Sequence, residues 1–221
     1  MITIGNTSEK ILIFRSEYNI HCRYLKMEIQ RLHRYLNKIS PISEEAWADF
    51  FQIIEPVVLH KNEYLIREGS RAFRCFLLTD GVIRTFYNKN GNECNTSFFV
   101  PGMFPVPHTA LLTNGPSRFT FQAVLSSRLI QFPYNDFLKL CERHQSLEVL
   151  KQRIFEQRLV EKEQHESAMD SNNATENYLI FQKTYPGLEN LIPKFHIASY
   201  LGITPVLLKR IQTLMPKQIH T

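Results

Sequence analysis

The residues of this 221-residue chain that are best suited to chemistry are the cations near its C-terminal end. Residues 190–221 contain four basic residues and neither Asp nor Glu. Neutralising the phosphates of a nucleic acid requires positive charge of this kind. The whole chain has the same sign, with 26 basic and 21 acidic residues and a net charge of +5. That surplus is mild, and many proteins without a polyanion partner are equally basic.

The same segment has the spacing of two short helices joined by a turn. Ala198 and Gly202 stand four residues apart. A small residue lets two helices cross closely, and glycine permits a left-handed turn. Thr204-Pro205 is typical of a helix N-cap followed by proline at the first helical position. The pattern predicts a helix-turn-helix unit over residues 192–213. Its apolar positions are Ile197, Leu201, Ile203, Leu208 and Ile211.

The second of these helices would present one face outward, towards DNA. Arg210 on that face can donate two hydrogen bonds to guanine, and Val206 can contact the methyl group of thymine. The alternative to a DNA-binding helix-turn-helix is a generic helical hairpin. The combination of spacing, cap and charge supports this alternative less well than the helix-turn-helix. The candidate DNA-binding residues are Lys194, Thr204, Pro205, Val206, Lys209, Arg210 and Thr213.

Turns at regular intervals mark the middle of the chain. Five of the eight glycines lie between residues 64 and 132, and four of these follow Asp, Asn or Pro. Short runs of β-branched and aromatic residues separate the turns, which predicts an all-β sandwich, barrel or jelly roll. In the run 82–87, alternation places Arg84 on one face and Thr85 on the other. The predicted strands are 64–66, 76–78, 82–87, 96–100, 119–124 and 129–132.

Helical periodicity flanks this predicted roll on both sides. We expect a helix over 27–39 and a second from Ser43, ended by Pro56, with Trp47, Phe50, Phe51 and Ile54 as its buried stripe. After the roll we expect helices over 134–144, 146–168 and 175–184. The polar stretch 167–175 is the predicted domain boundary. The helix over 146–168 is longer than average; it either pairs two copies of the chain or lies solvated on its own domain.

The chain resembles the Crp/Fnr family of bacterial transcription regulators in the order of its predicted parts. These are a β-roll with glycine turns at regular intervals, a long helix, a hinge and a helix-turn-helix. The resemblance covers roughly residues 27–213. Residues 61–69 are similar to the start of the family's cyclic-nucleotide-binding-type domain. Residues 185–205 are similar to wing-less members, which end soon after the recognition helix. The implied fold is α+β: an antiparallel, jelly-roll-like β-roll flanked by helices, a long dimerisation helix and a small helix-turn-helix domain.

The resemblance also implies a function. The protein would be a non-enzymatic, one-component regulator that binds double-stranded DNA as a homodimer, with recognition helices in successive major grooves, and that contacts RNA polymerase. We expect it to be cytoplasmic, because no apolar run approaches the length of a membrane span. The implied domains are an N-terminal extension (1–26), the β-roll sensor (27–145), the dimerisation helix (146–168) and the DNA-binding domain (169–221).

The sequence departs from the family at the nucleotide site. Nucleotide-binding members carry a cassette similar to Phe-Gly-Glu-Leu, followed later by Arg-Ser/Thr-Ala. Residues 104–108 of this chain are Phe-Pro-Val-Pro-His, and Arg118-Phe119-Thr120 follow. The Gly and Glu are absent and two prolines remove amide donors, so we expect no cAMP binding by the family mode; the roll holds another small effector or none. The candidate effector-pocket residues are Arg84, Phe104, His108, Thr109, Arg118 and Thr120.

The recognition helix departs from the family as well. Members often carry Arg, Glu and Arg where this chain has Pro205, Val206 and Arg210. Without the Glu, an acceptor for the amino group of cytosine is missing, which predicts altered or reduced base specificity. The alternative function is a small-ligand-binding or protein-interaction module with a vestigial helix-turn-helix. Lys209 and Arg210 on an exposed basic face shared across a dimer would favour the regulator, and Val206 and Leu207 buried against another surface would favour the module.

Other chemistry finds little support in the sequence. Cupin-type metal enzymes also use a β-roll, but they need a His-x-His pair with a following Glu, and the chain has none. Iron–sulfur sensing needs a cysteine cluster near the N-terminus, where Cys22 stands alone. Haem ligation through Cys75 or His108 stays open. We see no nucleophile–base pair, P-loop or dinucleotide fingerprint, and we expect no cofactor or metal.

Overall fold

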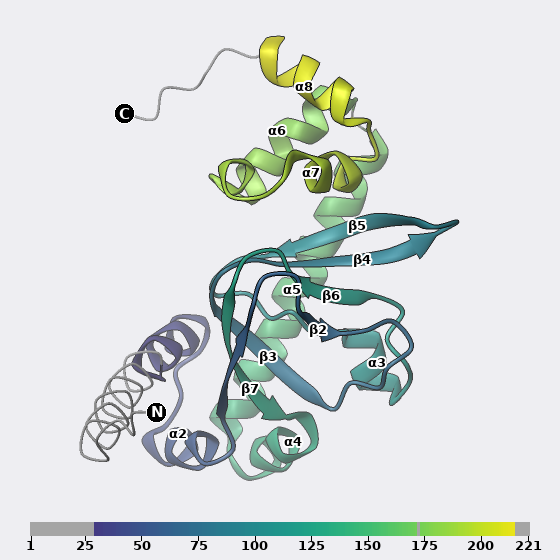
Figure 1. The fold of residues 1–221 in the computed structure, drawn as a ribbon. Helices are drawn as coiled ribbons and strands as arrows, with labels where there is room; N and C mark the ends of the chain where they lie inside the picture. Colours follow the sequence, from purple (N-terminus) through teal and green to yellow (C-terminus); the bar gives the residue numbers. More distant parts are fainter. Residues whose placement is uncertain (1–28, 172, 215–221) are drawn as a thin grey trace, which may run out of the picture.

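The computed structural model describes residues 29–171 and 173–214. A β-roll occupies the middle of the molecule, with helices from the N-terminal half at one end and helices from the C-terminal part at the other (Figure 1). The predicted N-terminal extension, 1–26, lies outside the described residues. Within the described residues, no helix combines the length and the apolar character that crossing a membrane would require.

The roll consists of two antiparallel sheets. In the first, β1 (Glu55–Leu59), β7 (Ser127–Pro133) and β3 (Arg74–Asp80) pair in that order. In the second, the order is β2 (Tyr64–Ile66), β6 (Thr120–Ala123), β4 (Ile83–Lys89) and β5 (Asn92–Phe99). All six predicted strands are confirmed to within a few residues, and the α+β class with an antiparallel roll is correct. Strand β1 was not predicted.

The region around Pro56 shows why β1 escaped prediction. The helix that Ser43 caps, α2 (Glu44–Phe51), ends earlier than expected, and Pro56 lies within β1 instead of ending a helix. Because β1 is an edge strand, a residue without an N–H group is tolerated there. The predicted stripe is therefore wrong at Phe51, which is 42% exposed, whereas Phe50 is buried.

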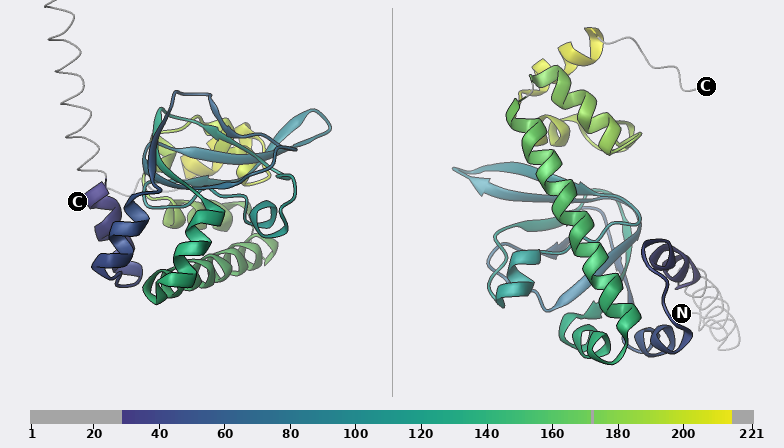
Figure 2. Two further views of the ribbon diagram at one scale, coloured as in Figure 1. Left: turned by 90° about the horizontal axis from the view of Figure 1, so that it is seen from below. Right: turned by 180° about the vertical axis from the view of Figure 1, so that it is seen from behind.

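The other helices follow the predicted periodicity more closely. Residues 29–39 are helical, and α3 (His108–Thr113) lies between β5 and β6. After the roll come α4 (Tyr134–Arg143) and α5 (Gln145–Ser171), which runs along the roll towards the C-terminal helices (Figure 2). Because α5 extends to Ser171, the stretch 167–175 forms a much shorter joint than predicted. The C-terminal unit comprises α6 (Ala174–Thr184), η1 (Leu188–Asn190), α7 (Lys194–Tyr200) and α8 (Pro205–Leu214).

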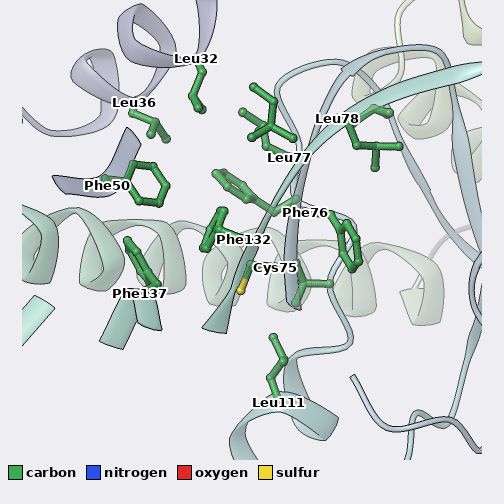
Figure 3. Close-up of a cluster of buried hydrophobic side chains, with 14 of the residues drawn as sticks. Leu32, Leu36, Phe50, Cys75, Phe76, Leu77, Leu78, Leu111, Phe132 and Phe137 are labelled. Atoms are coloured by element: carbon green, nitrogen blue, oxygen red, sulfur yellow. The ribbon is translucent and has the colours of Figure 1, made fainter. Parts of the chain in front are cut away.

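A first hydrophobic core joins the N-terminal helices and α4 to the three-stranded sheet. Phe50 meets Phe132 and Phe137 with ring centroids 5.0 and 5.4 Å apart. Leu32 and Leu36 point from the helix at 29–39 towards the same cluster (Figure 3). These contacts explain why Phe50, the central residue of the predicted aromatic stripe, lies in the core.

A second core lies on the outer face of the four-stranded sheet. Phe98 of β5 is completely buried there. Its ring centroid is 6.1 Å from that of Phe181, 5.8 Å from Tyr185 and 5.5 Å from Tyr200. Val82 belongs to the same cluster. The C-terminal unit is therefore packed against the sheet of the roll.

The turn at Gly81 generates a test of the roll's geometry. Gly81 and Gly91 both have positive φ, +91° and +84°. A Cβ on Gly81 would lie 2.6 Å from the carbonyl oxygen of Ser126, whereas one on Gly91 would have no neighbour within 4 Å. We expect Gly91→Ala to destabilise by about 1–2 kcal/mol through backbone strain alone. Gly81→Ala should cost roughly 1–3 kcal/mol more, because the backbone must also move.

Urea unfolding of the two variants measures this difference, with Gly91→Ala as the matched control. Equal losses in the two proteins would show that the close approach of residues 81 and 126 is absent in solution.

Candidate functional site

A cavity of about 710 Å³ lies beside the edge of β5, between the interior of the roll and the C-terminal unit. This volume falls within the range of small-molecule sites. The roll contributes Phe99 and Phe121, and α3 contributes Thr109. From the C-terminal unit, Asn177 and Tyr200 complete the wall. The cavity therefore brings two parts of the chain to one site.

The charges in its wall limit the ligands that it suits. Arg118 and Lys162 are exposed cations in the lining, and the described lining residues include no carboxylate. Thr85 Oγ1 and Asn177 Oδ1 are buried without a hydrogen-bond partner among the described residues. Unsatisfied buried polar atoms cost about 1–3 kcal/mol each. The cavity favours a neutral or anionic, largely apolar molecule over a cation.

The segment in front of α3 is poorly suited to hold a cyclic phosphate. Pro105 and Pro107 have no amide hydrogen. The amide of His108 donates to the carbonyl of Val106 at 3.0 Å. Burial, with the nearby Arg158, lowers the pKa of His108 to about 4. Its imidazole is therefore neutral at pH 7, and Pro105, Pro107 and His108 supply neither an available amide hydrogen nor a positive charge to an anion.

Only some of the predicted pocket residues come together in the large cavity. His108, Thr109 and Arg118 line it, whereas Phe104 lines a separate apolar cavity. Thr120 is buried, and its Oγ1 accepts a hydrogen bond of 3.1 Å from the amide of Glu68. Arg84 lies on the opposite face of the sheet.

The separate apolar cavity bears on the haem alternative. It measures about 60 Å³ and is lined by Cys75, His108 and Leu111, among others. That volume is near the room taken by two water molecules in the liquid, at roughly 30 Å³ each, and it leaves no space for a macrocycle. Burial raises the pKa of the Cys75 thiol to about 12, so the thiolate that would ligate iron is disfavoured. No group of three metal-ligating side chains occurs within 29–171 and 173–214.

Arg84 forms a buried polar network instead. Its Nε donates to Gln122 Oε1 at 2.9 Å, and its Nη1 donates to Asn95 Oδ1 at 3.0 Å. Its guanidinium also pairs with Glu93 and lies 4.0 Å above the ring of Phe86. The residue is only 4% exposed. Alternation along β4 had placed Arg84 and Phe86 on one face, but it did not show that this face meets the C-terminal unit.

The network extends from the sheet into α7. Nη1 of Arg84 lies 3.3 Å from Nδ1 of His196. Asn95 donates from its side chain to the carbonyl of His196 at 2.9 Å and from its backbone to Ser199 Oγ at 3.0 Å. Burial, with the adjacent Arg84, lowers the pKa of His196 to about 4. The imidazole is therefore neutral at pH 7, and its Nδ1 can accept from Arg84. Sequence reasoning missed His196, which carries no motif.

The turn between α7 and α8 has the glycine conformation and the helix cap that the sequence predicted. Gly202 adopts a φ of +66°, and Thr204 Oγ1 accepts a hydrogen bond of 3.2 Å from the amide of Leu207. Ala198, Leu208 and other apolar residues form the small core between the helices.

All seven predicted DNA-binding residues lie on the exposed surface of this pair. Val206 is 79% exposed, and Lys209, Arg210 and Thr213 are exposed beside it on α8. Lys194 of α7 is also exposed and donates to Gln212 Oε1 at 2.8 Å. Thr204 and Pro205, at the start of α8, are exposed as well. The described part of the chain itself covers neither the cations nor Val206.

Several solved structures share the fold of this chain. FixK2 from Bradyrhizobium japonicum has a TM-score of 0.60 at 17% identity, over 73% of this chain and 83% of that protein. The c-di-GMP responsive global regulator CLP from Xanthomonas campestris has a TM-score of 0.60 at 12% identity, with coverages of 77% and 90%. The sensor domain of the transcriptional regulator DNR from Pseudomonas aeruginosa gives 0.51 at 18%, with coverages of 63% and 91%. At these identities the likeness shows the fold alone.

Comparisons of the amino-acid sequence gave one match, to a family model. None of the curated proteins compared with the chain matches it. The family model of the cyclic nucleotide-binding domain matches residues 56–144, which run from β1 to the end of α4. Over residues 56–144 the chain is therefore similar to a cyclic nucleotide-binding domain.

Proposed function

We propose that the protein is a one-component transcription regulator that binds double-stranded DNA as a homodimer. Helices α7 and α8 act as its helix-turn-helix, with α8 as the recognition helix. The observation that carries the proposal is the exposed basic face of α8. The helix contains Lys209 and Arg210 but no Asp or Glu, and no described element covers these two cations. The fold likeness to two proteins described as regulators, CLP and DNR, agrees with it.

The dimensions and chemistry of α8 suit the major groove. An α-helix with its side chains is about 10–12 Å across, and the major groove is about 12 Å wide. Arg210 would read guanine, Val206 would contact thymine, and Lys209 and Lys194 would neutralise phosphates. Specificity would depend on few base contacts, because Pro205 and Val206 offer no hydrogen-bonding side chain.

Helix α5 would hold two copies together. Its first half is committed to its own roll, because Leu147 and Leu150 are buried in the first core. Further along, Leu159 and Val160 are 59% and 50% exposed. Adjacent exposed apolar residues on a long helix are a suitable contact for the same helix of a second copy. Pairing there would present two α8 helices to two half-sites of a near-palindrome.

The roll would serve as the sensor, and the large cavity as the site of its effector. The lining supports a neutral or anionic molecule with a substantial apolar surface. The prolines before α3 argue against cAMP in the family mode.

A double substitution on α8 tests DNA reading. In Lys209→Ala/Arg210→Ala, we expect affinity for fragments selected from genomic DNA to fall at least tenfold, about 1.4 kcal/mol. The salt slope should fall by roughly one for each phosphate that the variant no longer neutralises. Electrophoretic mobility shift over a salt series measures both quantities.

The control for this test is Arg67→Ala/Lys139→Ala, which removes the same charge from exposed positions on the roll and α4. If the two double variants lose affinity equally, charge alone attracts DNA, and the regulator proposal fails. Wild type that retains no DNA, but that binds protein through Val206 and Leu207, would establish the interaction-module alternative.

The dimer generates a separate prediction. Leu159→Glu should convert the protein to monomers in sedimentation velocity, because like charges would then face each other across the contact. Leu112→Glu, a change at a leucine of α3 that is 62% exposed, should leave the dimer intact. Dimers that persist in Leu159→Glu would place the contact elsewhere.

A thermal shift experiment tests the effector prediction. Binding with a Kd of 10 μM would add about 2.7 kcal/mol at 1 mM ligand, which raises the Tm of a protein of this size by roughly 5–10 °C. We expect 1 mM cAMP to raise it by less than about 1 °C, no more than AMP does. A larger rise with cAMP that disappears in Arg118→Ala would show that the chain binds cAMP after all.

A further inference from the structure

We propose that Arg84 is a positioning residue for the recognition helix. Through Asn95 and His196, Arg84 holds α7 in one orientation on the roll, and release of this polar contact lets the C-terminal unit turn relative to the sensor. The consequence for DNA binding rests on the proposed function, whereas the contact itself can be tested without it.

The partners of Arg84 make the contact reversible. Gln122, Glu93 and Phe86 all belong to the roll and remain beside the guanidinium if α7 moves away. Among the described partners of Arg84, only His196 comes from the C-terminal unit. Moving α7 away therefore strands no buried charge, because Arg84 keeps a carboxylate and gains water. A cation whose only partner lay across the interface would instead resist separation strongly.

Asn95 is the directional part of the contact. Its side chain accepts from Arg84 and donates to the carbonyl of His196, while its amide donates to Ser199 Oγ. Ser199 Oγ in turn donates to the carbonyl of Glu93 at 2.9 Å. Because β5 is an edge strand, its outward backbone groups are free to make such bonds. These bonds fix the direction of α7, since hydrogen bonds weaken steeply when misaligned.

The aromatic contact at Phe98 lies three residues further along β5. Strand geometry puts this about 10 Å from Asn95. Apolar contact is not directional, so the rings around Phe98 can keep the unit attached while the bonds at Asn95 break. The aromatic cluster around Phe98 can thus act as a pivot. We call the hydrogen bonds of Asn95 with Arg84, His196 and Ser199 the catch, because they hold α7 in one orientation.

The catch lies beside the large cavity. Asn95 lines that cavity from the roll, and Tyr200, Leu201 and Gly202 line it from the end of α7 and the following turn. A molecule in the cavity would therefore touch residues on both sides of the catch, without needing to act through α5.

Amide hydrogen exchange measured by NMR tests the catch directly. In Arg84→Met, which keeps the length of the side chain and removes the charge, the Asn95 amide should exchange at least tenfold faster than in wild type. The amide of Ile130, in the other sheet, should be unaffected. Arg67→Met is the matched control, because Arg67 stacks on Tyr64 at 3.8 Å and is exposed. His196→Leu removes the partner on α7 and leaves the roll intact, so it serves even if Arg84→Met folds poorly.

The combination of variants separates positioning from general destabilisation. We expect His196→Leu to accelerate Asn95 exchange to a similar degree, and Arg84→Met/His196→Leu to add little, because both changes open the same contact. Exchange at Asn95 that stays at the wild-type rate in both single variants would overturn the proposal. Acceleration that extends equally to Ile130 would also overturn it, because it would report global unfolding.

DNA affinity, measured separately, decides the consequence. If wild type binds DNA, we expect Arg84→Met to change its affinity at least fivefold, and an unchanged affinity would refute a role in regulation. If wild type binds no DNA, the proposed function fails, and the exchange data still decide whether Arg84 positions α7.

Discussion

The central part of the four-stranded sheet is buried on both of its faces, and the arrangement of the rest of the molecule depends on this constraint. On the inner face, Ile83 is fully buried in the first core. On the outer face, Phe98 is fully buried in the second. If the C-terminal unit moved off the sheet, Phe98 and the aromatic residues packed on it would be exposed to water. The unit therefore stays against the outer face of the sheet.

The C-terminal unit needs this contact as much as the sheet does. Residues 173–214 amount to some forty residues, a size at which a hydrophobic core rarely sustains a fold alone. Phe98 from the roll fills the space between Phe181, Tyr185 and Tyr200. The polar bonds of Tyr178 with Gln212 at 2.9 Å and with Glu189 hold α6, α8 and η1 to one another. The unit is therefore coherent internally but is completed by the roll.

The same constraint explains what the sequence could and could not predict. Paired turn residues such as Asp80-Gly81 located the strands, because glycine and asparagine readily adopt the positive φ of tight turns, as Gly81 and Asn90 do here. Period-two alternation also separated Arg84 from Thr85 correctly. It could not show which face lines the roll, because both faces are apolar, and so Arg84 was assigned to the effector pocket. His196 gave no signal at all, since its role depends on a strand a hundred residues away.

The joint between α5 and α6 limits how the C-terminal unit can move. Only residues 172 and 173 separate the two helices, so the unit cannot travel far from the roll without unwinding a helix. It can rotate if a contact gives way on the other side, against β5. Three aromatic pairs there contribute about 0.5–1.5 kcal/mol each, the same range as the net contribution of a typical hydrogen bond. Burial of the apolar surface of the rings adds to the aromatic contribution at about 25 cal/mol per Å². The aromatic cluster thus accounts for most of the adhesion, and the network of Arg84 and Asn95 for the orientation. Attachment and orientation are consequently held by different residues, so a change in the roll can turn α8 without detaching it.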